Sequence, residues 1–274
     1  MSWLEAIVLG LTQGLTEFLP ISSSAHVRIV PALAGWEDPG AAFTAVIQIG
    51  TVAAVLLFFR ADLVRIARSL LASLRDRSLW RTADHDAKLG WYIVLGTIPI
   101  SIVGLALKDQ IENEVRSLEL ISTVLILFSA VLYAADRAGK REREVGDIDG
   151  RDGLVIGFAQ ALALVPGVSR SGATISFGLF RGLTRAAAAR YSFLLSVPAV
   201  VLSGLFELRK IGEEGANAGF GATAIATVVA FVSGYMSIAW LLRYIQRHNF
   251  NAFVLYRVIV GAVILTLALS GVIA

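Results

Sequence analysis

Residues 10–26 read GLTQGLTEFLPISSSAH, and residues 157–174 read GFAQALALVPGVSRSGAT. Each stretch is an apolar run that a proline interrupts just before a cluster of hydroxyl-bearing residues. The segments on either side of each break have about 11 to 14 residues, whereas a helix needs about 20 apolar residues to cross the hydrocarbon core of a membrane. Both regions therefore predict re-entrant helix-turn-helix hairpins, over residues 3–34 and 152–181.

The rest of the chain is typical of a polytopic membrane protein. Of its 274 residues, 56% are hydrophobic and only 16% are charged, whereas an average soluble domain has roughly 25% charged residues. Six runs lack Asp, Glu, Lys and Arg and approach the length of a membrane span: residues 41–59, 89–107, 120–135, 191–206, 220–242 and 258–274. The predicted fold is all-α, with six transmembrane helices and two re-entrant hairpins in a single membrane domain, residues 1–274.

The two halves of the chain resemble each other weakly. Aligning Pro20 with Pro166 brings the two interrupted regions into register with a slip of one residue. Each half, residues 1–135 and 152–274, then contains one hairpin and three spans. Because an odd number of crossings reverses the orientation of the second half, the pattern predicts an inverted repeat. The tips of the two hairpins are expected to meet within the membrane.

Charges in the loops predict the orientation. Loops 60–88, 136–151 and 243–249 carry 14 Lys and Arg residues, while loops 108–117 and 207–218 on the other face carry four. The basic face is expected to be cytoplasmic. This places both termini outside and makes the pocket between the hairpins open outward.

Composition also excludes several classes of function. The chain has no cysteine, which excludes disulfides, thiolate metal sites and thiol catalysis. The net charge is only +3, and the basic residues lie between apolar runs rather than along a stripe, so no nucleic-acid partner is expected.

The first hairpin carries polar residues that are unfavourable at membrane depth. Gln13 and Glu17 are one helical turn apart on the same face, and Pro20 ends that helix three residues later. A carboxylate near a helix C-terminus opposes the helix dipole and is costly in apolar surroundings, so Glu17 is a poor choice for a purely structural role. Three serines and His26 follow at the tip.

The second tip carries a positive charge where the helix dipole disfavours it. Ser169 is expected to cap the helix that begins there, which places Arg170, a cation, in the first turn of that helix. Both misplacements are relieved if Glu17 and Gln13 help to hold a metal cation while Arg170 and the free N–H groups hold an anion. Phosphate is the obvious candidate anion.

Structural alternatives stay open for each of these residues. The hydroxyls can bond to backbone carbonyls, as Ser and Thr commonly do in membrane helices. Glu17 and Arg170 can form a buried ion pair, and His26 can be a packing residue. Gln48 can line the site. Arg257, near the expected cytoplasmic end of the last span, can either extend to the interface or take part in the site.

At these residues the chain resembles the undecaprenyl-diphosphate phosphatase family, the bacitracin-resistance type of integral membrane phosphatase. The resemblance covers nearly the whole chain and is most specific at residues 13–26 and 166–174. It implies hydrolysis of a C55 polyprenyl diphosphate to polyprenyl phosphate and inorganic phosphate, which returns the lipid carrier to peptidoglycan synthesis. It also implies a location in the bacterial cytoplasmic membrane and a divalent cation, Mg or Ca, as cofactor.

The resemblance also implies roles for individual residues. The positions that match the family's catalytic residues are Glu17, Ser23, His26 and Arg170. The positions that match its phosphate-binding residues are Ser169 and Thr174, and Ser22, Ser24, Ser171 and Gln48 are further candidates for binding the substrate phosphate. Glu17 and Gln13 are the candidate metal ligands, although many family members have Glu at position 13, so this chain has one fewer anionic ligand.

Two mechanisms and one rival function stay open. Either Ser23 attacks the terminal phosphorus with His26 as its base, or His26 itself becomes phosphorylated. Alternatively, the chain is a transporter or flippase of a lipid phosphate, because secondary carriers are also built from inverted repeats with broken helices. The expected partners are the polyprenyl diphosphate and membrane lipid, and a homodimer is left open.

Overall fold

The computed structural model describes residues 1–75, 84–107, 117–214 and 219–273. The described residues form α-helices and one short 3-10 helix, and no strand is found among them. The helices are α1 (Trp3–Glu17), α2 (Ser23–Ala34), α3 (Gly40–Phe58), α4 (Arg60–Arg75), α5 (His85–Ala106), α7 (Leu118–Ala138), η2 (Val145–Asp147), α8 (Gly150–Leu162), α9 (Arg170–Phe180), α10 (Arg185–Glu214), α11 (Phe220–Tyr244) and α12 (Asn251–Leu269). The predicted all-α class is confirmed.

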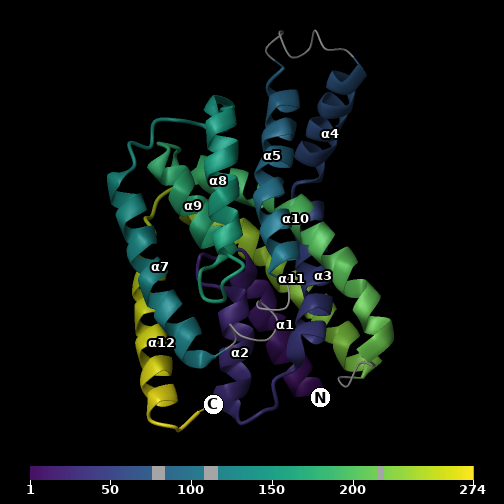
Figure 1. The fold of residues 1–274 in the computed structure, drawn as a ribbon, viewed down its shortest axis with the longest axis vertical. Coiled ribbons are helices and arrows are strands. Elements are labelled where there is room, and N and C mark those ends of the chain that lie inside the picture. Colours follow the sequence, from purple (N-terminus) through teal and green to yellow (C-terminus); the bar gives the residue numbers. More distant parts are fainter. Residues whose placement is uncertain (76–83, 108–116, 215–218, 274) are drawn as a thin grey trace.

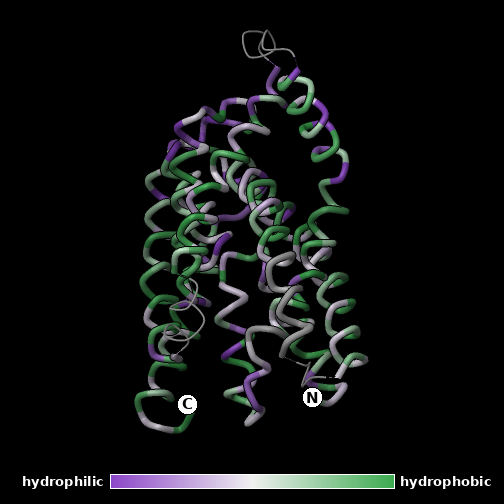
Figure 2. Tube along the Cα trace, turned by 45° about the vertical axis from the view of Figure 1, so that its right-hand side comes forward, coloured by the Kyte–Doolittle hydropathy of each residue, from purple (hydrophilic) through white to green (hydrophobic). Residues whose placement is uncertain are grey.

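Five helices are long and apolar enough to cross a membrane: α5, α7, α10, α11 and α12. A sixth predicted span, residues 41–59, corresponds to α3, which meets α4 at an angle of 77°. Figure 2 shows hydrophobic residues along these helices and hydrophilic residues gathered at the end of the molecule where α4 lies. The protein is therefore a multi-pass membrane protein.

Part of the predicted loop 60–88 is helical. Helix α4 begins immediately after α3, and its apolar residues at helical spacing face α5, where the Leu70 and Ile66 side chains lie against Gly90. The basic residues of this segment favoured a loop. An amphipathic helix at the end of the bundle accounts for both the charges and the apolar face.

The two predicted hairpins are present and enter from opposite ends. In Figure 1, α1 and α2 extend from the end that holds both termini, and α8 and α9 extend from the other end. Helix α1 has 15 residues, and at 1.5 Å per residue such a helix is about 22 Å long, which is too short for a core of about 30 Å. The turns between the helices of each pair therefore lie inside the bundle.

Glycines allow each hairpin to pack closely on a long helix. A Cβ added at Gly10 of α1 would lie 2.4 Å from the carbonyl oxygen of Ala226 in α11. In the second hairpin, a Cβ added at Gly157 of α8 would lie 2.5 Å from the Cα of Gly96 in α5. Small residues at these crossings let the backbones approach, as is usual between membrane helices. They fix the depth of both tips.

Ion pairs hold the second hairpin at the polar end of the molecule. The carboxylate of Asp152, at the start of α8, is fully buried and accepts hydrogen bonds from Arg143 Nη2 at 2.5 Å and Arg181 Nε at 2.6 Å. Burial alone would raise the pKa of Asp152, but the hydrogen bonds from Arg143, the Asp149 N–H and Arg181 outweigh it and lower that pKa below its usual value. The start of α8 is thus tied to the end of α9.

Candidate active site

The two turns meet in the middle of the bundle. Ser171 Oγ, in the second hairpin, donates a hydrogen bond to the carbonyl oxygen of Leu19 in the first at 2.9 Å. Each helix after a turn is preceded by a serine at positive φ, Ser22 at 74° before α2 and Ser169 at 72° before α9. The expected meeting of the tips is confirmed.

A buried ion pair joins the tips. Arg170 Nη2 lies 2.7 Å from Glu17 Oε1, and the side chains of Arg170 and Glu17 are 14% and 6% exposed. The second carboxylate oxygen, Oε2, accepts a hydrogen bond from Gln13 Nε2 at 2.9 Å. Gln13 reaches it because residues four apart in a helix share a face. The ion-pair alternative is therefore present in the structure.

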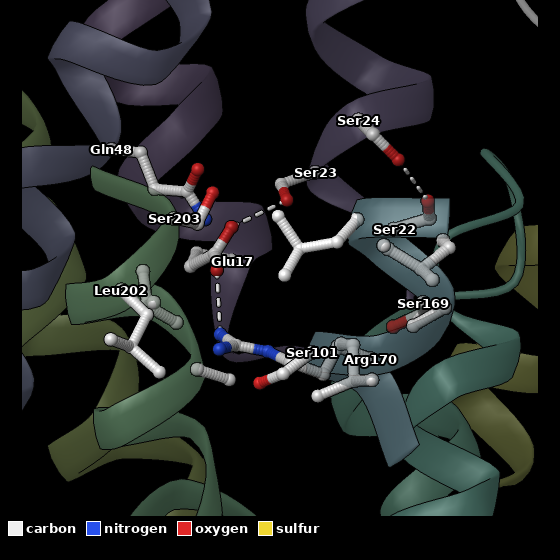
Figure 3. Close-up of a pocket in the computed structure, with 17 residues that line it drawn as sticks. Glu17, Ser22, Ser23, Ser24, Gln48, Ser101, Ser169, Arg170, Leu202 and Ser203 are labelled. Atoms are coloured by element: carbon white, nitrogen blue, oxygen red, sulfur yellow. Dashed lines mark hydrogen bonds and ion pairs between the residues drawn. The ribbon is translucent and has the colours of Figure 1, made fainter. Parts of the chain in front are cut away.

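Ser23 completes this cluster. Its Oγ donates to Glu17 Oε2 at 2.5 Å, as Figure 3 shows. One carboxylate thus receives hydrogen bonds from a guanidinium on one side and from a hydroxyl and an amide on the other. An oxygen that accepts from a hydroxyl at this distance is placed to take its proton.

A cavity of about 540 Å³ opens beside the cluster. Its polar wall is formed by Glu17, Ser22, Ser23, Ser24, Gln48, Ser169 and Arg170. Its apolar wall comes from α5, α10 and the break after α8, and includes Ile100, Leu105, Leu164, Val200 and Leu202.

Seven of the ten predicted catalytic and binding positions line this cavity, and the other three, Ser171, Thr174 and His26, do not. Ser22 and Ser24 share a hydrogen bond of 3.2 Å and both line the wall. Ser169 also lines it, while its Oγ accepts from the Gly172 N–H and caps α9. The Ser171 hydroxyl is used by Leu19, as described above.

Thr174 lies one turn inside α9. Its hydroxyl is 2.8 Å from the Arg170 carbonyl oxygen and 2.6 Å from Ser192 Oγ of α10. Thr174 is therefore not among the residues that line the cavity, and its contacts hold α9 against α10. Its predicted role in phosphate binding stays a prediction.

His26 points away from Ser23. Its Nδ1 lies 2.7 Å from the Ser22 carbonyl oxygen, and its Nε2 lies 2.7 Å from the Tyr256 hydroxyl. Because a carbonyl only accepts, Nδ1 carries a proton that it donates to Ser22, and Nε2 shares a hydrogen bond with the Tyr256 hydroxyl. The ring also stacks on Tyr256. The base that contacts Ser23 in this structure is Glu17, not His26.

Two serines of the cavity wall were not predicted as site residues. Ser101 of α5 and Ser203 of α10 line the cavity. Each is one of several hydroxyl-bearing residues in an apolar span, and such residues are too common in membrane helices to identify a site. Arg257 does not extend to the interface, because it is 1% exposed and contacts both turns.

The described residues offer few metal ligands. No three His, Asp or Glu side chains gather anywhere in the part of the chain that the structure covers. At the tips, the oxygen donors are the Glu17 carboxylate, the Gln13 side-chain amide and the Ser23 hydroxyl. A cation held here would need further oxygen ligands from a bound molecule.

Comparisons with known proteins identify the family of this chain. A family model described as bacitracin resistance protein BacA matches residues 6–263. The undecaprenyl-diphosphatase of Nocardioides sp. is 55% identical over 100% of this chain and 99% of its own length. Undecaprenyl-diphosphatase 2 of Streptomyces avermitilis is 51% identical over 99% of this chain and 96% of its own. Because the family model and these relatives span nearly all of it, the chain belongs to the bacitracin resistance protein BacA family.

Proposed function

We propose that this protein hydrolyses undecaprenyl diphosphate to undecaprenyl phosphate and inorganic phosphate, which returns the lipid carrier to peptidoglycan synthesis. The names of its relatives support this activity. The observation that carries it is the convergence of Glu17, Ser23 and Arg170 at one end of a cavity inside a membrane bundle. Phosphoryl transfer depends mainly on positioning and charge neutralisation, and a guanidinium beside a hydroxyl and its base provides both.

The shape of the cavity suits a lipid diphosphate. The diphosphate occupies the polar wall, and the prenyl chain leaves over the apolar wall formed by α5 and α10. Leu105 and Leu202 line this wall and remain 69% and 53% exposed. Large exposed apolar side chains at the edge of a cavity give the chain an apolar path toward the surrounding lipid.

The contacts favour Ser23 as the nucleophile. Glu17 takes the proton from Ser23 Oγ, which attacks the terminal phosphorus while the bond to the bridging oxygen breaks and undecaprenyl phosphate leaves. Water then attacks the phosphoserine, Glu17 returns the proton to Ser23 Oγ, and inorganic phosphate leaves with the protons of that water. Arg170 neutralises the charge on the transferred phosphoryl group.

His26 is the other candidate nucleophile. Both of its ring nitrogens already have hydrogen-bond partners, and it does not line the cavity. The two versions are separated by trapping the intermediate with labelled substrate in a rapid acid quench. An acid-stable, alkali-labile phosphate on residue 23 is expected, whereas acid-labile phosphate on residue 26 would refute the serine mechanism.

We propose Mg or Ca as cofactor, held by Glu17 and Gln13. These oxygen donors fit a hard cation, and Mg²⁺ at phosphate sites is commonly bound by one or two carboxylates together with substrate oxygens. When bound, the cation would neutralise charge on the diphosphate. Among the described residues that line the cavity, Glu17 supplies the only carboxylate, so it is the main candidate ligand for the cation.

The rival proposal is a carrier for a lipid phosphate. The assay that separates them uses purified protein in detergent with undecaprenyl diphosphate. A hydrolase releases inorganic phosphate and loses this activity in Arg170→Ala, whereas a carrier releases none in the wild-type form. The Ser23–Glu17 contact favours the hydrolase, because anion transport alone does not need a hydroxyl paired with a base.

We also propose that residues 1–135 and 152–274 are inverted repeats. Two parallels support this: the hairpins enter from opposite ends (Figure 1), and each tip has the same serine geometry. Ser169 Oγ lies 3.2 Å from Ser171 Oγ, just as Ser22 Oγ lies 3.2 Å from Ser24 Oγ. We further propose a location in the bacterial cytoplasmic membrane, which the family supports, with both termini outside, which the loop charges support.

A further inference from the structure

Arg257 of α12 is a buried arginine whose five hydrogen bonds all go to backbone carbonyls. Its Nη1 donates to the Pro20 oxygen at 3.0 Å and to the Val168 oxygen at 3.2 Å. Its Nη2 donates to the Gly167 oxygen at 2.9 Å and to Val168 again at 3.3 Å. Its Nε donates to the Leu125 oxygen of α7 at 3.2 Å.

Three of these four carbonyls lie where the helices are interrupted, and the fourth, that of Leu125, lies within α7. Pro20 belongs to the turn of the first hairpin, and Gly167 and Val168 belong to the turn of the second. Irregular backbone at membrane depth has carbonyls without helical partners, and they must be satisfied inside the protein. The planar guanidinium, with five donors in a fixed fork, can satisfy several of them at once, whereas a lysine ammonium cannot hold that geometry.

The anchored carbonyls are close in sequence to the reacting groups. Pro20 lies three residues from both Glu17 and Ser23, and Val168 lies two residues before Arg170. The neighbouring Tyr256 contacts His26 in the first turn of α2. Tyr256 and Arg257 of α12 therefore both contact the first tip, and Arg257 also contacts the second.

We propose that Arg257 is a positioning residue that sets the distance between the Ser23–Glu17 pair and Arg170. It does not line the cavity. It acts by fixing both turns on one rigid group, so that the hydroxyl, its base and the guanidinium face the same phosphate. A misplacement of about 1 Å at such a site is enough to lower the rate about 100-fold.

The proposal rests on the proposed hydrolysis, and its test includes a readout that does not. The variants are Arg257→Lys and Arg257→Met, each purified in detergent and compared with wild type. Matched controls are Arg185→Lys and Arg185→Met, because Arg185 is a half-buried arginine that pairs with Asp136 at 2.6 Å and does not contact the tips. Two quantities are measured: kcat and KM for undecaprenyl diphosphate, and hydrogen exchange of the amides in residues 18–24 and 165–171.

We expect Arg257→Lys to lower kcat at least tenfold with KM changed less than threefold, because the binding groups remain while their alignment is lost. Arg257→Met should lower kcat further. Both should speed amide exchange at the two tips, and the Arg185 variants should do neither. Should Arg257→Met fail to fold, the lysine variant carries the test.

The proposal is overturned if Arg257→Lys keeps wild-type kcat, or if amide exchange at the tips is unchanged. It is also overturned if the Arg185 variants reduce kcat equally, which would indicate a general structural role. Should wild type release no phosphate, the proposed hydrolysis fails, and the exchange measurement still decides whether Arg257 anchors the tips.

Discussion

Replacing Glu17 with glutamine tests the central contact of the site. The carboxylate accepts from Arg170 Nη2 at 2.7 Å, Ser23 Oγ at 2.5 Å and Gln13 Nε2 at 2.9 Å. In Glu17→Gln the amide oxygen can face Arg170 while its NH₂ faces Ser23. The hydroxyl and a flipped Gln13 amide can then accept instead of donate, so every polar group keeps a partner.

The direction of the Ser23 hydrogen bond is what changes. With an amide in place of the carboxylate, nothing in this contact can take the serine proton. Removing a general base typically costs 10² to 10⁴ in rate, so we expect kcat to fall by a factor on the order of 10³. Arg170 keeps a hydrogen-bond acceptor but loses its counter-charge, and breaking a buried ion pair in this way costs about 3–5 kcal/mol of stability.

The loss of the Glu17 charge should also strengthen phosphate binding, in contrast to its effect on activity and stability. Because Glu17 competes with phosphate for Arg170, the variant should bind inorganic phosphate more tightly than wild type, and phosphate should raise its melting temperature more. Activity is measured as phosphate release from undecaprenyl diphosphate in detergent, and stability as thermal unfolding with and without phosphate. Glu5→Gln, in the first turn of the same helix, is the matched control and should behave as wild type, because glutamine can keep the capping contact with Ser2.

Two results would refute this reasoning. The first is Glu17→Gln retaining activity within threefold of wild type, which would show that Glu17 is not the base. The second is an unchanged phosphate-dependent shift in melting temperature, which would show that the carboxylate does not compete with phosphate for the guanidinium.

Four further outcomes are expected. Arg170→Lys keeps the charge but loses the fork, so phosphate release should fall at least tenfold in the detergent assay. Asp152→Asn should lower the melting temperature at neutral pH; because the folded pKa of Asp152 lies below its usual value of 3.8, the difference from wild type should shrink as pH falls through that lower value. Gly157→Leu should prevent α8 from packing on α5 and abolish folding, as judged by size-exclusion chromatography, since even a Cβ would lie 2.5 Å from Gly96. A single cysteine introduced at Glu37, in a chain that has none, should be labelled by an impermeant reagent from outside intact cells if both termini lie outside.

The pattern of interrupted apolar runs was sufficient to predict the fold class and the two hairpins. Length alone settles this, because segments of 11 to 15 residues cannot cross the membrane and have to turn back inside it. The same reasoning placed Glu17 and Arg170 at the tips, since Pro20 and Pro166 mark where each helix is broken. Helix α4 lies within the predicted loop 60–88, because its basic residues interrupt the apolar run that a membrane span requires.

The partners of each side chain were decided only by the tertiary structure. Ser23 and His26 are three residues apart, and no local pattern separates them. The imidazole nevertheless contacts Tyr256, and Glu17 is the partner of Ser23. Arg257 has no local signal for its role, because its contacts are with turns about 90 and 237 residues away. The sequence by itself determined which polar groups are too costly to be in a membrane without a function. Which of them face one another depends on long-range packing of helices, which no local pattern encodes.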